Sequence, residues 1–325
     1  MLNKYEGCLL GIAIGDALGA PVEQFTLGEI RSRYGVGGIR DFDEFRGFAE
    51  GFYTDDTQMT LATAHGIIDA EKLTREGDEV DSAWSVYNRY LQWLDTQSDP
   101  ELRRGPGHTC LEALGSGKMG TLVEKINDSK GCGGVMRTAP AGLAYPPGKA
   151  FEQGTRFAAI THGHPSGYLP AGFLANAIAR LVERKSIEDA IEQSSQLLIG
   201  YDGHEETLKK IDLALELVSS KHTTEYAIKT IGAGWVGEEA LAIAVYCALI
   251  FPDSWEDAVL AAVNHSGDSD STGSITGGIM GAHLGIGAIP GRWKRDVENS
   301  KEILELAAAM RHLAGGGNLP AHAMG

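Results

Sequence analysis

Two segments near opposite ends of the chain carry glycine at every fourth position, and this spacing constrains the fold more than any other feature. The members are Gly7, Gly11, Gly15 and Gly19 in the first segment and Gly273, Gly277, Gly281 and Gly285 in the second. Residues four apart share one face of a helix, so each ladder predicts a flat helical surface. Because a glycine inside a helix costs roughly 1 kcal/mol relative to alanine, we expect the two helices to pack closely against each other.

A membrane-embedded helix pair is the competing interpretation of such ladders. The second ladder is interrupted by Ser274, Thr276 and His283, and the sequence contains no apolar run of the ~18 residues that a membrane-spanning helix needs. The ladders therefore favour a close helix pair in the core of a globular protein.

The second ladder begins in the densest cluster of acids and hydroxyls in the chain. Asp268 and Asp270 alternate with Ser269 and Ser271, directly before a helix-compatible run. Helix N-capping is the simpler interpretation, but a cap needs only one such residue. Oxygen ligands of this kind suit Mg²⁺, Mn²⁺ or Ca²⁺ rather than Zn²⁺.

A second cluster of the same type, Thr54-Asp55-Asp56-Thr57, lies at a predicted helix start far earlier in the chain. Adjacent carboxylates repel each other, and solvent or a cation between them relieves the repulsion. If the two helices are neighbours, both clusters would surround a pair of cations, and sites of that kind bind substrate oxygens and activate water.

The composition, at 325 residues with 43% hydrophobic and 22% charged, is that of a globular protein with a substantial core, and one large domain or two smaller ones both fit. The formal net charge of -16 argues against nonspecific binding to nucleic acid or to an anionic membrane, which both need a basic surface. The four cysteines lack CxxC spacing and no secretory signal precedes them. We expect reduced thiols and a cytoplasmic protein.

Hydrophobic periodicity and capping residues predict an all-α fold, and no segment has a convincing strand pattern. The first helix is expected to begin almost immediately in the chain and to include the ladder of residues 7–20. Further helices are expected at residues about 54–70, 81–97, 109–116, 169–184, 186–198, 204–219, 223–230, 238–251 and 254–264, and after the acidic cluster at 268–271. Residues 31–53 are expected to form an ordered loop and residues 98–108 a turn-rich connection. The tail after about residue 313 is expected to be frayed.

Three further motifs have weaker functional interpretations. The glycine-rich segment 131–134 precedes a predicted helix and exposes N–H groups suited to phosphate, although it matches neither the P-loop nor the dinucleotide fingerprint. In Thr161-His162-Gly163-His164, helix capping or hydrogen bonding to a ligand is favoured over Zn²⁺ binding. Trp235 fits stacking on a base or filling the core equally well.

Three charged residues receive predicted roles from their positions. Asp16 lies inside the first predicted helix and is expected to be structural, whereas Glu23 follows that helix and is free to act in chemistry. Arg137 is expected to form a buried structural pair rather than to bind phosphate.

In their order along the chain, these motifs resemble those of the ADP-ribosylglycohydrolase family, and the resemblance covers nearly the whole chain. The matching segments are Gly15-Asp16-Ala17-Leu18-Gly19 through Glu23, Thr54-Asp55-Asp56, the loop from Gly131 to Pro140, Thr161-His162-Gly163-His164-Pro165, and Asp268-Ser269-Asp270-Ser271. Each motif is unspecific alone, but five in this order are specific. The resemblance implies a single domain over residues 1–325, folded as a compact, orthogonal, all-α multi-helix bundle with a binuclear metal site in a central cleft.

The resemblance also implies roles for individual residues. Two divalent cations, Mg²⁺ or Mn²⁺, would be held by Thr54, Asp55, Asp56, Asp268, Asp270 and Ser271. Acid–base catalysis would fall to Glu23 or Asp56, and Glu23 also matches an acid that coordinates metal or gates the site. Substrate would be bound by Cys132, Gly133, Gly134, Val135, Met136 and His162, with Trp235 near the adenosine end.

Two positions depart from the usual family pattern. Ser271 stands where threonine is usual, and because serine keeps a hydroxyl ligand we expect metal binding to survive. Cys132 stands where asparagine is usual, which puts one hydrogen bond to the substrate in doubt.

The implied reaction is hydrolysis of the bond between the anomeric carbon of ADP-ribose and a protein side chain. The implied partners are an ADP-ribosylated protein as substrate and ADP-ribose as product, with no nucleic acid or membrane, and a monomer is expected. An arginine linkage is favoured over ADP-ribosyl-serine and O-acetyl-ADP-ribose. A non-catalytic ADP-ribose-binding or structural relative and a hydrolase of free nucleotides are the alternatives, and the full set of acids favours the enzyme.

Overall fold

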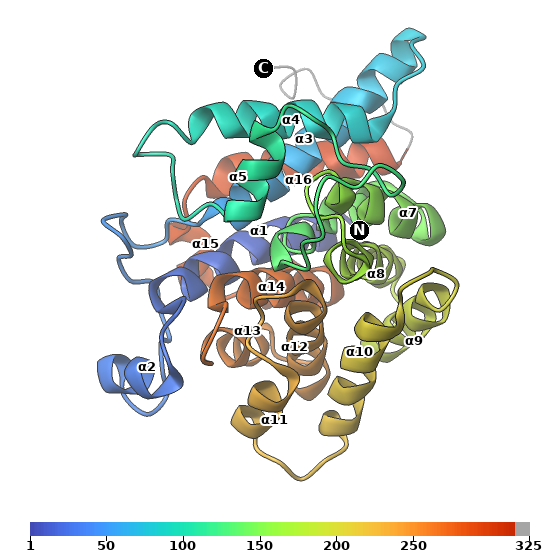
Figure 1. Ribbon diagram of the computed structural model, residues 1–325. Helices are drawn as coiled ribbons and strands as arrows, with labels where there is room; N and C mark the ends of the chain where they lie inside the picture. The colour runs from blue at the N-terminus through green and yellow to red at the C-terminus, as the bar shows by residue number, and fades with distance from the viewer. Residues whose placement is uncertain (316–325) are drawn as a thin grey trace.

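The computed structural model describes residues 1–315, and every regular element in this range is helical (Figure 1). The α-helices are α1 (Leu2–Gly19), α2 (Leu27–Tyr34), α3 (Asp55–Glu76), α4 (Ser82–Thr96), α5 (His108–Gly115), α6 (Ala139–Ala144), α7 (Pro147–Ala159), α8 (Pro165–Val182), α9 (Ile187–Leu198), α10 (Glu205–Val218), α11 (Thr224–Ile231), α12 (Gly237–Ile250), α13 (Trp255–Val263), α14 (Ser269–Leu284), α15 (Gly291–Asp296) and α16 (Ser300–Ala314). Three short 3₁₀ helices are η1 (Ala20–Val22), η2 (Cys132–Gly134) and η3 (Ile286–Ala288). The all-α prediction is confirmed for the described range, where β pairing is limited to two isolated bridges.

The two glycine ladders pack face to face at the centre of the molecule, where α1 and α14 lie side by side in blue and orange (Figure 1). A Cβ atom on Gly7 would lie 2.5 Å from the carbonyl oxygen of Gly281, and one on Gly15 would lie 2.0 Å from that of Gly273. Real Cβ atoms do not approach backbone this closely, so the predicted pairing is confirmed. The order of the contacts makes the helices antiparallel, and the end of α1 therefore lies beside the start of α14.

Helix α14 is enclosed over most of its length, because other helices pack against all of its faces. Residues 269–282 are all buried, and the helix packs against α1, α8, α12 and α13. A helix with this many glycines and hydroxyls has little apolar surface of its own to bury, so it depends on these larger neighbours for stability.

The structure corrects the prediction for residues 31–53. Residues 31–34 belong to α2, which begins at a capping box formed by Thr26 and Glu29. In this box Thr26 accepts from the Glu29 N–H and the Glu29 side chain accepts from the Thr26 N–H. The sequence Thr26-Leu27-Gly28-Glu29 has the spacing of a capping box, but the glycines that follow α2 favour a loop.

Two long helices had no counterpart among the predictions. Helix α7 begins at Pro146-Pro147-Gly148, which resembles a turn, although proline is well suited to the first turn of a helix. Helix α16 continues to Ala314, past the point where fraying was expected, and residues 316–325 of the predicted frayed tail lie outside the described range.

No single helix within residues 1–315 is long and apolar enough to cross a membrane. The consecutive segments Leu2–Val22 and Leu27–Tyr34 meet that requirement only when they are taken together, and they meet at a bend of 92°.

Candidate functional site

The acids at the starts of α3 and α14 line one cavity of about 210 Å³. Asp55 and Asp56 come from α3, and Asp268, Asp270 and Ser271 come from the start of α14. The antiparallel pairing of α1 with α14 brings the segment after α1 to the same place, so that Glu23 joins them. The structure thus brings together two acidic clusters that are far apart in sequence.

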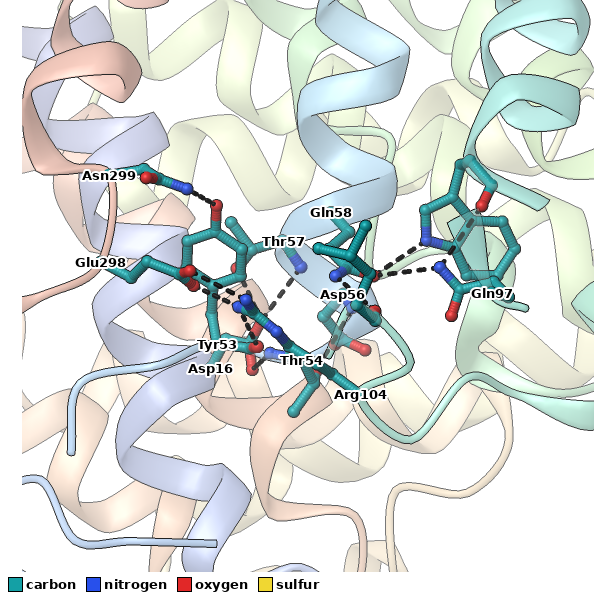
Figure 2. A network of polar contacts seen from close by, with 12 residues as sticks. Asp16, Tyr53, Thr54, Asp56, Thr57, Gln58, Gln97, Arg104, Glu298 and Asn299 are labelled. Carbon is teal, nitrogen blue, oxygen red and sulfur yellow. Dashed lines mark hydrogen bonds and ion pairs between the residues drawn. The ribbon is translucent and has the colours of Figure 1, made fainter. Parts of the chain in front are cut away.

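The start of α3 is held by Asp16, which projects from α1 (Figure 2). Asp16 Oδ1 accepts from the Thr54 N–H at 3.0 Å, and its Oδ2 accepts from the N–H and hydroxyl of Thr57 at 2.9 and 2.6 Å. Thr54 itself caps the helix by accepting from the Asp56 N–H. As expected, Asp16 has a structural role, and through it α1 fixes the direction of the two acids that follow.

The start of α14 is fixed by the backbone that precedes it. Gly267 has a φ of 152°, and a Cβ atom there would lie 2.0 Å from the carbonyl oxygen of Ala233. The Asp268 N–H donates to the same carbonyl at 2.9 Å, and Asp268 Oδ1 caps the helix by accepting from the Ser271 N–H. Only glycine permits this turn at position 267, which aims Asp268 at the cavity.

The four aspartates of the cavity are deeply buried and repel one another. Asp55, Asp56, Asp268 and Asp270 are 4, 3, 3 and 6% exposed. Burial raises the pKa of Asp55 to about 8. Burial, followed by the neighbouring carboxylates, raises the pKa of Asp56 and of Asp270 well above its ordinary value.

No cationic side chain among the described residues pairs with any of these four acids. Asp56 Oδ2 is buried without a hydrogen-bond partner. Buried charges are costly unless they are paired or bind a metal. An all-oxygen donor set with an orphaned carboxylate oxygen fits a hard divalent cation.

The ligand atoms do not converge on a single point as the side chains stand. Within the described range, no three acidic, histidine or cysteine side chains form a group that could hold a metal ion. Asp268 Oδ2 instead accepts from the Cys132 thiol at 2.8 Å, and Asp55 Oδ2 accepts from the Gly107 N–H at 3.2 Å. These contacts satisfy two of the acids through neutral donors.

Glu23 lies at the rim of the cavity and is held by the loop between α2 and α3. Its Oε2 pairs with the Arg46 guanidinium at 2.8 Å, and its Oε1 accepts from Gln24. Burial raises the pKa of Glu23, and the nearby Arg46 charge opposes this rise.

The glycine loop forms a second wall of the cavity. Cys132, Gly133 and Met136 line it, together with His162, whose ring packs on the loop. A Cβ atom on Gly133 would lie 2.9 Å from His162 Cε1, so glycine allows the ring to approach. Burial lowers the pKa of His162 to about 3, and its Nδ1 is 2.8 Å from the Thr161 hydroxyl, so this imidazole is neutral. The other histidine of this motif, His164, caps α8.

Three of the predicted site residues lie behind the cavity wall, and their functional roles stay predictions. Thr54 is occupied with capping α3. Gly134 is packed so that a Cβ atom would lie 2.4 Å from the Gly167 carbonyl oxygen, and Val135 is fully buried. Trp235, by contrast, lines the cavity and is 43% exposed, which makes core filling the wrong interpretation of this residue.

Arg137 is buried and structural, as predicted, but its partners are not acids. Its guanidinium is fully buried and lies 4.4 Å from the centre of the Tyr90 ring. It donates to the Thr161 hydroxyl at 2.6 Å and to Cys110 Sγ at 3.2 Å. Aromatic and neutral acceptors are therefore its partners, and Arg137 supports Thr161 behind His162.

The segment before and at the start of α5 completes the cavity, and this contribution was not predicted. Its lining members are Gly105, Gly107, His108, Thr109 and Cys110. In the sequence this segment has turn residues but no concentration of acids or hydroxyls, so only the tertiary structure reveals its place.

Known proteins are similar to this chain over nearly its whole length, including the segments that form the candidate site. The sequence profile of the ADP-ribosylglycohydrolase family matches residues 1–319. The chain is 27% identical to the ADP-ribosyl-[dinitrogen reductase] glycohydrolase of Rhodospirillum rubrum, covering 96% of this chain and 97% of that protein. It is 26% identical to the human ADP-ribosylhydrolase ARH3, with coverage of 96% and 94%, and 27% identical to the ADP-ribosylarginine hydrolase Tri1 of Serratia proteamaculans, with coverage of 96% and 80%.

A solved structure described as an ADP-ribosylglycohydrolase-related protein complex superposes with a TM-score of 0.71 at 25% identity, covering 96% of this chain and 98% of that one. The match extends through both acidic clusters and the glycine loop. The chain therefore belongs to the ADP-ribosylglycohydrolase family.

Proposed function

We propose that this protein is a metal-dependent hydrolase that releases ADP-ribose from modified protein side chains. Family membership supports ADP-ribosyl hydrolase activity in general. The observation that carries the more specific proposal is the sharing of one cavity by four buried aspartates and the glycine loop. Such a cavity offers oxygen ligands on one wall and backbone N–H groups on the other.

Two divalent cations, Mg²⁺ or Mn²⁺, would be held by the residues at the starts of α3 and α14. These are Thr54, Asp55, Asp56, Asp268, Asp270 and Ser271. The bound cations would supply Lewis-acid chemistry, which orients the ribose hydroxyls and a water molecule. The carboxylates would turn from Cys132 and Gly107 toward the cations, because charge–charge attraction exceeds a hydrogen bond to a neutral donor.

Glu23 would carry the proton. Asp56 is the other candidate, but a carboxylate that holds a cation has fewer free lone pairs for proton transfer. Glu23 stands at the rim, outside the set of proposed cation ligands, and its partner Arg46 comes from a loop rather than a helix. From this position it would transfer a proton between water and the departing side chain.

The substrate would lie between the two walls, with the diphosphate against the loop formed by residues 131–136. Backbone N–H groups in a glycine loop suit phosphate oxygens. His162 is neutral and buried, so it would contribute shape and a hydrogen bond rather than charge. Trp235, exposed at the rim, would stack on the adenine base.

The favoured linkage is ADP-ribosyl-arginine. Its support is the relative named for that activity, the ADP-ribosylarginine hydrolase Tri1. ADP-ribosyl-serine and O-acetyl-ADP-ribose are the alternatives, because the chain is about as similar to human ADP-ribosylhydrolase ARH3, whose name specifies no linkage, as it is to Tri1.

The decisive experiment offers arginine-, serine- and acetyl-linked ADP-ribose to the protein with Mg²⁺ or Mn²⁺ and measures the release of ADP-ribose. We expect release from the arginine linkage in the wild type and at least about a hundredfold less in Asp55→Ala and Asp268→Ala. The exposed Asp78→Ala is the matched control and should keep full activity. Turnover that is unaffected by the two cavity variants would refute the metal proposal, and no release from any substrate would favour a binding protein.

A further inference from the structure

A second, larger cavity lies directly beside the candidate functional site. It encloses about 750 Å³ between α10 and the start of α12, and Lys130 and Glu238 are among its lining residues. Neither residue belongs to the site described above.

A short backbone contact separates the two cavities. Gly131 and Val236 form an isolated bridge, the Cys132 N–H donates to the carbonyl of Trp235 at 3.2 Å, and the Gly237 N–H donates to that of Lys130 at 2.8 Å. Cys132 and Trp235 face the candidate site. A ligand in the second cavity would therefore lie against the backbone contact between residues 130–132 and 235–237, which also forms one wall of the candidate functional site.

Glu238 is the feature that points to a ligand. It lines the second cavity at only 7% exposure, and its Oε2 has no hydrogen-bond partner among the described residues. Its place in the first turn of α12 offsets part of the cost of burying a charge, because helix N-termini favour negative groups. The helix N-terminus does not provide a hydrogen-bond donor to Oε2. A buried carboxylate oxygen without a partner is costly, so a ligand that donates a hydrogen bond to it would bind favourably.

Two of the three lysines that line the cavity are already paired with other acids. Lys130 Nζ lies 2.6 and 2.8 Å from the two carboxylate oxygens of Glu206, which also accepts from the Ser166 hydroxyl. Lys210 pairs with Glu239 at 3.0 Å. Five carboxylates and three ammonium groups line the cavity, so its net charge is negative.

We propose that this second cavity binds an organic cation, a primary ammonium or guanidinium group on a flexible chain, with Glu238 as its principal contact. The chemistry fits two sources: a free polyamine, or a lysine or arginine side chain of a polypeptide bound at the neighbouring site. Both present several N–H donors on an aliphatic stem, which matches a cavity lined by acids and by Leu208 and Leu213.

The test is calorimetric titration of the whole protein with two probes, spermidine and a short arginine-containing peptide amide, at physiological ionic strength. We expect saturable binding of at least one probe, and at least tenfold weaker binding by Glu238→Gln, which keeps the shape of the side chain and removes its charge. Glu302→Gln removes one exposed charge on α16 and should bind within about twofold of the wild type.

The outcomes separate the two sources and can refute the proposal. Tighter binding of spermidine would assign a free cation, and tighter binding of the peptide would assign a polypeptide. No saturable binding of either probe, or equal affinity in the wild type and Glu238→Gln, would overturn the proposal. The result does not depend on the hydrolase proposal, because binding is measured without turnover.

Glu206→Gln provides a second test in case Glu238→Gln does not fold. Glu206 is exposed, and glutamine keeps an acceptor for the Ser166 hydroxyl, so we expect the variant to fold. The substitution frees the ammonium group of Lys130, whose charge already acts on Glu238. We expect Lys130 to turn to Glu238 and to weaken probe binding at least fivefold. If Glu238→Gln cannot be measured, unchanged affinity in Glu206→Gln overturns the proposal.

Discussion

At the scale of single residues, the direction of the α3 acids depends on Asp16. This carboxylate accepts three hydrogen bonds from residues 54 and 57 and is fully buried (Figure 2). Asp16→Ala would leave three donors without a partner, and each buried unsatisfied group costs about 1–3 kcal/mol. We expect the free energy of unfolding to fall by about 3 kcal/mol or more, measured by urea denaturation.

Asp16→Asn is the matched control for this prediction. The amide keeps one acceptor oxygen at nearly the same position, so we expect a loss between those of the wild type and the alanine variant. Equal stability of all three proteins would show that Asp16 does not hold the start of α3.

His162 gives the protein a pH-dependent stability. Its pKa is about 3 in the folded state and 6.5 in its ordinary state, because burial disfavours the charged ring. Between these values the unfolded chain binds more protons, so stability falls as the pH falls below 6.5. The slope from this one residue is up to about 1.4 kcal/mol per pH unit.

Replacing His162 by glutamine tests this contribution. The variant lacks the titrating ring, so its stability should fall less between pH 6.5 and pH 5 than that of the wild type, with urea unfolding at each pH as the measurement. Parallel profiles for the two proteins would mean that the ring is not buried in its neutral form.

At the scale of elements, the contact between α1 and α14 leaves no space for a side chain. Gly15→Ala would place a methyl group 2.0 Å from the carbonyl oxygen of Gly273, where only backbone could yield. We expect the helices to separate and the free energy of unfolding to fall by at least about 3 kcal/mol, measured by thermal or urea unfolding.

Gly28→Ala is the matched control for the ladder. Gly28 lies in α2, and the nearest atom to a Cβ there is 3.8 Å away. Because alanine is the better helix former, stability should stay equal or rise by up to about 1 kcal/mol. If Gly15→Ala and Gly28→Ala have the same free energy of unfolding, the close packing of the two helices is contradicted.

At the scale of the whole molecule, one ion pair connects the C-terminal helix region to the wall of the candidate site. Arg104 and Glu298 form a bidentate pair (Figure 2). Arg104 is 5% exposed, and its guanidinium lies 4.7 Å from the centre of the Phe52 ring. Arg104 precedes Gly107, whose N–H donates to Asp55. The pair thus holds the segment 98–107 against the start of α3.

We expect Glu298→Gln to loosen that segment, because it leaves a buried guanidinium without its charge partner, at a cost of about 3 kcal/mol. Hydrogen exchange in the peptide covering residues 98–107 should become at least about tenfold faster. Glu305→Gln breaks an exposed pair with Lys301 and should leave exchange unchanged. Unchanged hydrogen exchange in Glu298→Gln would show that this ion pair does not hold the segment 98–107 in place.

The sequence by itself determined the all-helical fold, the pairing of α1 with α14 and the acidic starts of α3 and α14. These features depend on short-range rules: helical periodicity, N-capping and the absence of a Cβ atom at regular intervals. Such rules act within a few residues, so they can be applied to a window of sequence. The glycine ladders predicted that the end of α1 lies beside the start of α14. The position of the α3 acids beside them depends on the hydrogen bonds that Asp16 accepts from Thr54 and Thr57, which only the tertiary structure shows.

The tertiary structure alone decided which residues of the glycine loop face the cavity. Cys132, Gly133 and Met136 line it, whereas Gly134 and Val135 pack behind it. It also placed the segment 105–110 in the wall and gave Arg137 an aromatic partner instead of an acid. These outcomes depend on contacts between segments remote in sequence, and local periodicity carries no information about which distant surface a side chain will meet.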